Sequence, residues 1–114
     1  MPIDDKLAIL IRSNMLGEGE PDLGEKLITS MFTVLTESER LPHKIMFINS
    51  GIFLTAEGTP VLEQLRRLES EGVAILSCGT CLKYYDRADK LAVGHPTDMR
   101  ATVETLLGCR IVSL

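Results

Sequence analysis

Aromatic residues and positive charge are both scarce in this sequence. The chain contains no tryptophan, two tyrosines and three phenylalanines, and its 12 lysines and arginines are outnumbered by 16 aspartates and glutamates. It therefore lacks the aromatic platform on which single-stranded bases stack and the broad basic surface that follows phosphate groups. We expect no nucleic acid partner.

Long apolar segments are absent as well. No stretch of the sequence approaches the run of about 18 apolar residues that a membrane-spanning helix requires. The opening residues, MPIDDKLAILIRS, place acidic side chains before a short apolar run, which reverses the charge order of a signal peptide. We therefore expect a cytoplasmic protein with no membrane partner.

The cysteine count argues against a disulfide-stabilised secreted scaffold. There are three cysteines, an odd number, in a chain of 114 residues. A chain of this length buries roughly two-thirds of its unfolded surface in one core, so it needs no disulfides to fold. We expect one domain over residues 1–114, with reduced or reactive thiols.

Strand and helix patterns alternate along the chain. Apolar runs rich in Ile, Leu and Val predict buried strands, and apolar residues repeated every three or four positions predict helices. The predicted strands are residues 6–12, 44–49 after a break at Leu41-Pro42, 73–77, 91–93 before a turn at 94–96, and 109–114; the predicted helices are residues 21–37, 59–72, a short one opening at 78–81, and one capped by Thr97 or Asp98 and ended by Gly108. This order favours an α/β fold, a single three-layer domain with an about five-stranded, mostly parallel sheet and helices on both faces, in a flavodoxin-like arrangement.

Two apolar segments carry expectations about packing. In the last helix, Met99, Val103, Leu106 and Leu107 recur on one side and should form a buried stripe. Residues 52–54, Ile-Phe-Leu, fit neither the strand nor the helix period. We expect them to pack beneath the site or in a contact between subunits, and we therefore expect a homo-oligomer.

The stretch VAILSCGTC at residues 73–81 places two cysteines where a buried strand gives way to a helix. Backbone N–H groups at a helix N-terminus, together with the helix dipole, stabilise a thiolate relative to a thiol. We therefore predict Cys78 and Cys81 as the catalytic residues. Cys109 begins the last predicted strand, at the opposite edge of the sheet, and we expect it to be structural.

In an open parallel sheet, ligands bind in the crevice outside the carboxyl ends of the strands. The loops that follow the first four predicted strands should therefore surround the cysteine pair. The only histidine expected near the thiols is His95, while Lys83 is another source of positive charge. The predicted substrate-binding residues from these loops are Asn14, Gly17, Asn49, Ser50, Gly51, Gly79, Thr80 and His95.

Four stretches of the sequence, SNMLGEGEPDLGEKL, FINSGIFLT, GVAILSCGTCLKYY and KLAVGHPTDM, together resemble the DsrE-type domain of the YedF family of sulfurtransferase-like selenium-metabolism proteins. The resemblance covers essentially the whole chain, and CGTCL after a strand is its most specific part. It implies a DsrE-like fold related to the DsrE and TusD sulfur-relay subunits. By position, Cys78 matches the cysteine proposed to carry a persulfide in those subunits, and Cys81 matches the second cysteine of the CGTC motif.

The resemblance also implies a function and a partner. A persulfide or selenopersulfide would form on Cys78, with Cys81 as the second or resolving thiol. The TusA-like domain with its own Cys-Pro site, which precedes this domain in the usual YedF arrangement, is not in the sequence. We therefore expect the sulfur or selenium donor or acceptor to be another protein, such as a TusA-like chain.

Other interpretations of the cysteine pair remain open. Cysteines are often buried small apolar side chains, in which case the chain is a non-catalytic interaction module whose crevice and apolar loop bind a partner. A C-x-x-C motif near a strand–helix–strand pattern is also typical of thioredoxin-like dithiol/disulfide exchangers. Against exchange, the pair follows the third predicted strand and no aromatic residue precedes Cys78.

The sequence indicates neither a metal nor a cofactor. A structural zinc site needs four ligands, and only His95 is expected near the two cysteines. Gly17, Gly19 and Gly24 do not have the G-x-G-x-x-G spacing, and the acidic residues among them would repel phosphate. A dinucleotide-binding loop is therefore excluded.

Overall fold

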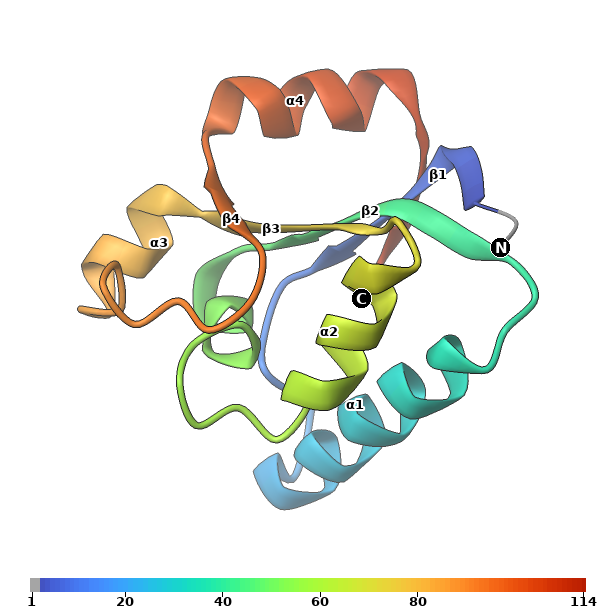
Figure 1. Ribbon diagram of the computed structural model, residues 1–114. Helices are drawn as coiled ribbons and strands as arrows, with labels where there is room; N and C mark the ends of the chain where they lie inside the picture. The colour runs from blue at the N-terminus through green and yellow to red at the C-terminus, as the bar shows by residue number, and fades with distance from the viewer. Residues whose placement is uncertain (1–2) are drawn as a thin grey trace.

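The computed structural model describes residues 3–114, in which five parallel strands form one sheet (Figure 1). The strands are β1 (Ile3–Ile11), β2 (Leu41–Phe47), β3 (Ala74–Cys78), β4 (His95–Thr97) and β5 (Arg110–Ser113), and the helices are α1 (Pro21–Thr36), the 3₁₀ helix η1 (Asn49–Leu54), α2 (Leu62–Ser70), α3 (Gly79–Tyr84) and α4 (Met99–Gly108). The strand order across the sheet is β4-β3-β2-β1-β5, and each neighbouring pair is parallel. The predicted α/β class is confirmed.

The helices form layers on the two faces of the sheet. Figure 1 shows α1 and α2 on one face, α4 on the other, and α3 continuing outward from the end of β3. This is the predicted three-layer arrangement, and it leaves the carboxyl ends of the strands uncovered by the two helix layers. The two cysteines of the C-x-x-C motif lie at that edge.

The main core lies between the sheet and the layer formed by α1 and α2. Ile9 and Ile11 of β1 are buried on this side, as alternate positions of a strand must be. From α1, Ile28 and Phe32 pack onto them, and the Phe32 ring stacks on Phe47 with 6.1 Å between centroids. Burying a side chain of this size contributes about 1.5–3 kcal/mol, so this layer holds the central strands in place.

The second strand begins earlier than the sequence indicates. β2 starts at Leu41 and includes Pro42, so the predicted break at Leu41-Pro42 was wrong. Pro42 pairs with Asp4 of β1, whereas pairing with β3 begins only at Lys44, so no bond to β3 is lost at the proline. Asp4 also accepts hydrogen bonds from Arg40 and Arg110, which ties β1 to the start of β2 and of β5.

The fourth strand also differs from the prediction. Residues 91–93 contribute only an isolated antiparallel bridge, and β4 is instead His95–Thr97, with Thr97 opposite Cys78 of β3. Pro96 is tolerated because β4 is an edge strand, which needs no N–H for a second neighbour. The predicted turn was therefore wrong, and His95 lies within a strand rather than in a loop that follows one.

The last helix turns its predicted apolar stripe toward solvent. Asp98 caps α4 by accepting the N–H of Ala101 at 2.8 Å, as one of the two predicted caps. The predicted burial of the stripe was wrong, since its residues are 38–84% exposed: Met99, Val103, Leu106 and Leu107. The exposed surface of α4 therefore carries these four apolar residues beside the charged Arg100 and Glu104.

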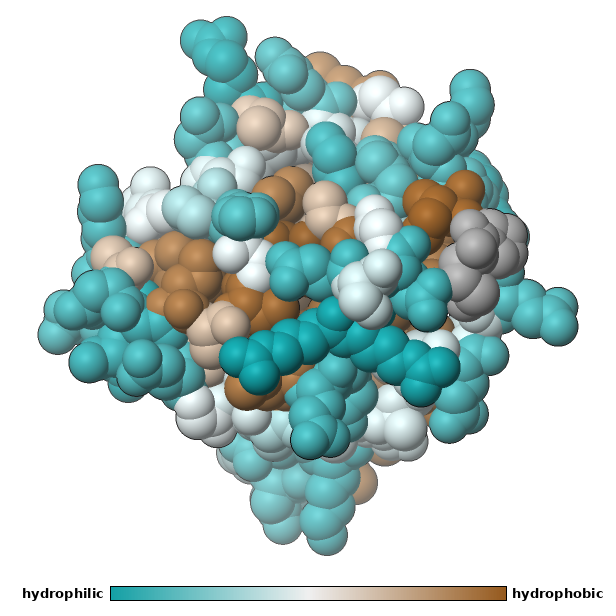
Figure 2. Space-filling model, viewed as in Figure 1, coloured by the Kyte–Doolittle hydropathy of each residue, from teal (hydrophilic) through white to brown (hydrophobic). Residues whose placement is uncertain are grey.

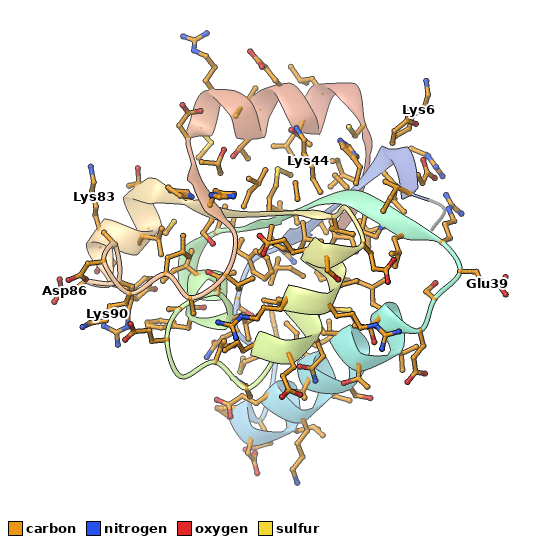
Figure 3. All side chains as sticks on the ribbon, viewed as in Figure 1. Lys6, Glu39, Lys44, Lys83, Asp86 and Lys90 are labelled. Atoms are coloured by element: carbon orange, nitrogen blue, oxygen red, sulfur yellow. The ribbon has the colours of Figure 1, made fainter. Side chains whose placement is uncertain are left out.

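Threonines form the inner side of α4. Thr102 and Thr105 are each 5% exposed, and their hydroxyls donate to carbonyl oxygens one turn earlier, at 2.9 and 3.0 Å. Because those hydroxyls are satisfied within the helix, their methyl groups can face the sheet. These short side chains leave room for Lys44, which reaches from β2 into this layer and donates to Thr105 Oγ1 at 3.2 Å (Figure 3).

The apolar segment at residues 52–54 belongs to η1, directly after β2. Ile52 and Leu54 are buried in the core, and Phe53 packs at its margin. The segment therefore packs under the carboxyl edge of the sheet, the first of its two predicted locations. On the face seen in Figure 2, hydrophobic residues show between hydrophilic ones across the middle of the molecule. Within residues 3–114, no helix is long and apolar enough to cross a membrane.

Candidate functional site

The two cysteines of the C-x-x-C motif lie where β3 ends and α3 begins. Cys78 is the last residue of β3 and the N-cap of α3, with an extended backbone at φ −60° and ψ 119°. Cys81 lies in the first turn of the helix. Both thiols are free, and their predicted position between a strand and a helix is confirmed.

A glycine allows the helix to start at this point. A Cβ atom at Gly79 would lie 3.3 Å from the carbonyl oxygen of Thr97 in β4, which is closer than most side chains tolerate. Residue 79 thus passes tightly under the edge strand. Cys78, the residue before it, pairs with Thr97 of β4 and is 6% exposed.

Cys81, in contrast, borders an open cleft. The cleft has a volume of about 430 Å³ and is lined by Asn49, Thr80, Cys81, Tyr84 and Tyr85. Cys81 is half-buried in its wall. Of the two sulfurs, it is Cys81 that a reactant in the cleft would meet first.

The sulfur of Cys81 is held by a backbone donor from a distant part of the chain. The N–H of Asn49 donates to Cys81 Sγ at 3.1 Å, and these residues are 32 positions apart in the sequence. Burial raises the pKa of the Cys81 thiol, the neighbouring Cys78 raises it further, and the Asn49 N–H lowers it. The net effect is a raised pKa, opposite to the lowering expected from a helix N-terminus.

The predicted substrate-binding residues divide into two groups. Asn49 and Thr80 line the cleft together with Cys81, whereas Ser50 and Gly51 lie beside it in the first turn of η1. Gly51 supports that turn: a Cβ there would lie 2.7 Å from the carbonyl oxygen of Ile11. The loop after β2 therefore contributes to the site as the sequence predicted.

The loop after β1 does not reach the cysteines. Asn14 lines a separate cavity of about 260 Å³ between the start of α1 and η1, and Gly17 lines another of about 310 Å³ beside Arg12 and Leu114. Because β1 and β3 are separated by β2 in the sheet, the loop after β1 opens onto a different part of the edge. The structure therefore does not bring Asn14 and Gly17 together with the thiols.

His95 is not positioned as a base for either cysteine. It is exposed at the start of β4, opposite Leu76, and no hydrogen bond joins it to Cys78 or Cys81 within residues 3–114. Lys83 projects into solvent from α3 (Figure 3). Neither residue contacts the cysteine sulfurs by an ion pair or a hydrogen bond in the described part of the chain.

Two tyrosines belong to the site although the sequence did not lead us to predict them there. Tyr84 and Tyr85 line the cleft, and the Tyr85 hydroxyl donates to Asn49 Oδ1 at 3.0 Å. The chain has only these two tyrosines, and both follow Cys81 by about one helical turn. That spacing is the signal that could have placed them beside the thiol.

In residues 3–114 no group of three or more His, Cys, Asp or Glu side chains is arranged to hold a metal ion. Cys109, predicted to be structural, is half-buried just after α4 and before β5, at the opposite edge from the pair. The polar groups at the cleft include the Cys81 thiol, the Asn49 amide and the hydroxyls of Thr80, Tyr84 and Tyr85.

Comparison with known proteins gives a fold but not a family. No protein-family model and no curated protein matches the sequence. The solved structures that match include the ychN protein from E. coli (TM-score 0.65, 12% identity, 96% of this chain and 99% of that chain), MTH1491 of unknown function from Methanobacterium thermoautotrophicum (0.69, 12%, 97% and 100%) and BT1422 of unknown function from Bacteroides thetaiotaomicron (0.63, 14%, 96% and 95%). At these identities the likeness concerns the fold alone. The chain has a DsrE-like fold, and its resemblance to the YedF family specifically stays a prediction.

Proposed function

We propose that this protein is a cytoplasmic carrier of sulfur or selenium, in which the Cys78–Cys81 pair holds the atom as a persulfide or selenopersulfide. The observation that supports this most is the pair itself: two free thiols at the carboxyl edge of the sheet, one of them opening onto a cleft. The resemblance of CGTCL and its flanking segments to YedF proteins supports the same chemistry.

In this proposal the transferred atom arrives at Cys81. Its sulfur borders the cleft, whereas Cys78 is 6% exposed behind it. This order is the reverse of the one predicted from the sequence, in which Cys78 takes the atom and Cys81 resolves it. Access decides which thiol can attack first, because both reactants must approach to bonding distance.

The first step is a thiol–persulfide exchange. The Cys81 thiolate attacks the outer sulfur of a donor persulfide, R–S–SH, and the S–S bond of the donor breaks. The R–S⁻ leaving group takes up the proton that Cys81 lost, and Cys81 becomes the persulfide. With R–S–SeH as donor, the same exchange leaves a selenopersulfide. No external oxidant or reductant is needed.

Two second steps are open to the Cys81 persulfide. An acceptor thiol can attack the outer sulfur, which passes the atom on and regenerates the Cys81 thiol. Alternatively, Cys78 attacks the inner sulfur, hydrosulfide leaves, and a Cys78–Cys81 disulfide forms. In that case the two thiols are oxidised by the sulfur atom that is reduced, so the electrons balance.

The donor or acceptor in this scheme is another protein, such as a TusA-like chain. Tyr84, at the rim of the cleft, is 82% exposed. Exposed tyrosines are enriched among the residues that dominate protein–protein interfaces, because they offer a large rigid ring and a polar tip. An aromatic rim beside the accessible thiol suits a protein partner.

Dithiol/disulfide exchange is the second candidate. A pair with one accessible and one buried free thiol is also what exchange requires. In thioredoxin-like proteins the motif has the same C-x-x-C form. Reduction of insulin disulfides by the reduced protein would support this candidate, and no reduction would eliminate it.

The carrier proposal is tested by loading the reduced protein with a small persulfide donor and locating the added sulfur by peptide mass spectrometry. We expect Cys81→Ser to abolish loading, and Cys78→Ser to retain a persulfide on Cys81. Cys109→Ser, which alters the distant cysteine, should load like the unchanged protein.

Two results would contradict the proposal in different ways. Loading of Cys81→Ser but not of Cys78→Ser would restore the order predicted from the sequence. No loading of any form, with ordinary alkylation of Cys81, would favour a non-catalytic interaction module instead.

A further inference from the structure

The hydrogen bond from Asn49 to Cys81 depends on an unusual backbone. Asn49 has φ of +52°, in the left-handed region that L-residues other than Asn, Asp and Gly rarely adopt. In this conformation its N–H points at Cys81 Sγ, at 3.1 Å. Whatever maintains the conformation of Asn49 therefore maintains the donor on the sulfur.

The side chain of Asn49 is fixed from two directions. Its Oδ1 accepts the N–H of Ser50 at 2.9 Å and the hydroxyl of Tyr85 at 3.0 Å. The first bond is local to the turn and is typical of asparagine in such conformations. The second comes from 36 residues away and couples the turn to α3.

The other end of this turn is anchored to the sheet. The N–H of Ile48 donates to the carbonyl oxygen of Ile11 at 3.0 Å, and a Cβ at Gly51 would lie 2.7 Å from the same oxygen. The turn at residues 48–51 therefore packs closely on Ile11, the last residue of β1. At its other end the turn is joined to the α3 segment by two hydrogen bonds, the one from the Tyr85 hydroxyl and the one to Cys81 Sγ.

Tyr85 is itself placed firmly. Its ring packs against Phe53 of η1 with 4.7 Å between centroids and against Tyr84 with 5.1 Å, and its N–H donates to the carbonyl oxygen of Cys81 at 3.1 Å. Cys81, Asn49 and Tyr85 therefore form a closed ring of hydrogen bonds. The same helical turn thus contains the Cys81 thiol and the Tyr85 hydroxyl, and that hydroxyl binds the residue whose N–H donates to the thiol.

We propose that Tyr85 is a positioning residue for Cys81, acting through Asn49 to hold a backbone N–H on the sulfur and so stabilise its anionic form. The use of that anion in sulfur transfer rests on the proposed carrier function. The positioning role of Tyr85 does not depend on that function, because it concerns only whether the Cys81 sulfur is a thiol or an anion. An N–H donor stabilises a thiolate or persulfide anion more than the neutral group.

Several charged or titratable groups belong to the elements next to Cys81. They are Cys78 of β3, the hydroxyls of Tyr84 and Tyr85, Lys83 of α3, Arg87 in the following turn, and His95 of β4. Arg87 lies over the Phe53 ring at 5.3 Å, and Lys83 projects into solvent (Figure 3). Asn49 of η1, whose N–H donates to the sulfur, and the next two residues, Ser50 and Gly51, carry no titratable side chain. Removing the Tyr85 hydroxyl leaves every other group in place.

The test is the pH profile of Cys81 alkylation by iodoacetamide, followed by peptide mass spectrometry. We expect Tyr85→Phe, which keeps the ring, to move the midpoint upward by about half a pH unit, since part of the anion stabilisation is lost. The alkylation midpoint of Cys109, read from the same samples, is the control: that thiol lies at the opposite edge of the sheet, so its midpoint should not move in Tyr85→Phe.

A second variant tests the route through Asn49. Asn49→Gly can adopt φ of +52° and keeps the backbone N–H, but it lacks the side-chain oxygen Oδ1 to which the Tyr85 hydroxyl donates. It should shift the midpoint at least as far as Tyr85→Phe does, because it also loses the bond from the Ser50 N–H, and the double variant should shift no further than Asn49→Gly alone. An unchanged midpoint in Tyr85→Phe, or additive shifts in the double variant, would overturn the proposal. Alkylation needs no sulfur donor, so a failure to carry sulfur would leave this result standing.

Discussion

At the scale of single residues, the two cysteines of the motif differ in their exposure and in one contact. Cys78 ends a buried strand, and Cys81 borders the cleft with the Asn49 N–H on its sulfur. Burial comes first among the causes that raise the pKa of Cys81, and Cys78 adds to it. Because only the thiolate attacks, a raised pKa makes Cys81 less reactive at neutral pH than an ordinary cysteine.

A prediction about pH follows from these causes. Alkylation of Cys81 should increase as pH rises through its raised pKa. Cys78→Ala should lower the midpoint, because it removes the contribution of the neighbouring thiol. The midpoint should stay above that of an ordinary cysteine, because burial remains. Site-resolved alkylation from about pH 6 to about pH 11 measures this, a range of about 2.5 pH units on either side of an unperturbed thiol.

Cys109→Ala provides the control, since that residue lies at the other edge of the sheet. Its Cys81 midpoint should equal that of the unchanged protein. A midpoint that rises in Cys78→Ala would show instead that Cys78 stabilises the Cys81 thiolate, and the neighbouring thiol could not then be a cause of the raised pKa.

At the scale of elements, α4 depends on its cap more than on a buried apolar side. Its inward residues are Thr102 and Thr105, and its N-terminus is closed by Asp98, which accepts the N–H of Ala101 at 2.8 Å. A helix with little apolar burial relies more on such local bonds. The cap also follows β4 directly, so it fixes where the chain leaves the sheet.

We predict that Asp98→Ala lowers the free energy of unfolding by about 1 kcal/mol, because the Ala101 N–H loses its partner. Urea unfolding followed by circular dichroism measures this loss. Glu104→Ala, on the exposed side of the same helix, should change stability by less than about 0.5 kcal/mol. Equal effects of the two substitutions would contradict the stabilising role of the cap.

At the scale of the whole molecule, the exposed apolar residues concern assembly. The sequence leads us to expect a homo-oligomer, and the outer face of α4 offers Val103, Leu106 and Leu107 to solvent. Contiguous exposed apolar surface of this kind favours a protein contact. Leu107 is 84% exposed, so within a single chain its side chain contributes little to folding.

We predict that the unchanged protein forms a homo-oligomer in solution and that Leu107→Glu lowers its mass, because a buried unpaired carboxylate is costly at an interface. Light scattering coupled to size-exclusion chromatography measures the mass. Ser70→Glu, which adds the same charge at the exposed end of α2, should leave the mass unchanged. A monomeric unchanged protein would refute the expectation.

The regular elements could be predicted because their signals are local. Apolar runs and three-to-four-residue spacing predicted elements at residues 21–37 and 73–77, nearly the bounds of α1 and β3. The motif that joins strand and helix at Cys78 is likewise visible in the sequence. β4 and Pro42 were misjudged because a proline normally interrupts a strand, and only the position of a strand within the sheet shows whether its N–H is needed.

The amino-acid sequence by itself determined the α/β class, the order of strands and helices, and the placement of two thiols at a strand end. Tertiary structure alone decided which thiol faces the cleft and which side of α4 is buried. It also decided that Asn49 and Tyr85, which are 36 residues apart in the sequence, form a hydrogen bond. The physical reason is that periodicity reports how a segment folds, whereas exposure and long-range hydrogen bonds depend on what packs against it.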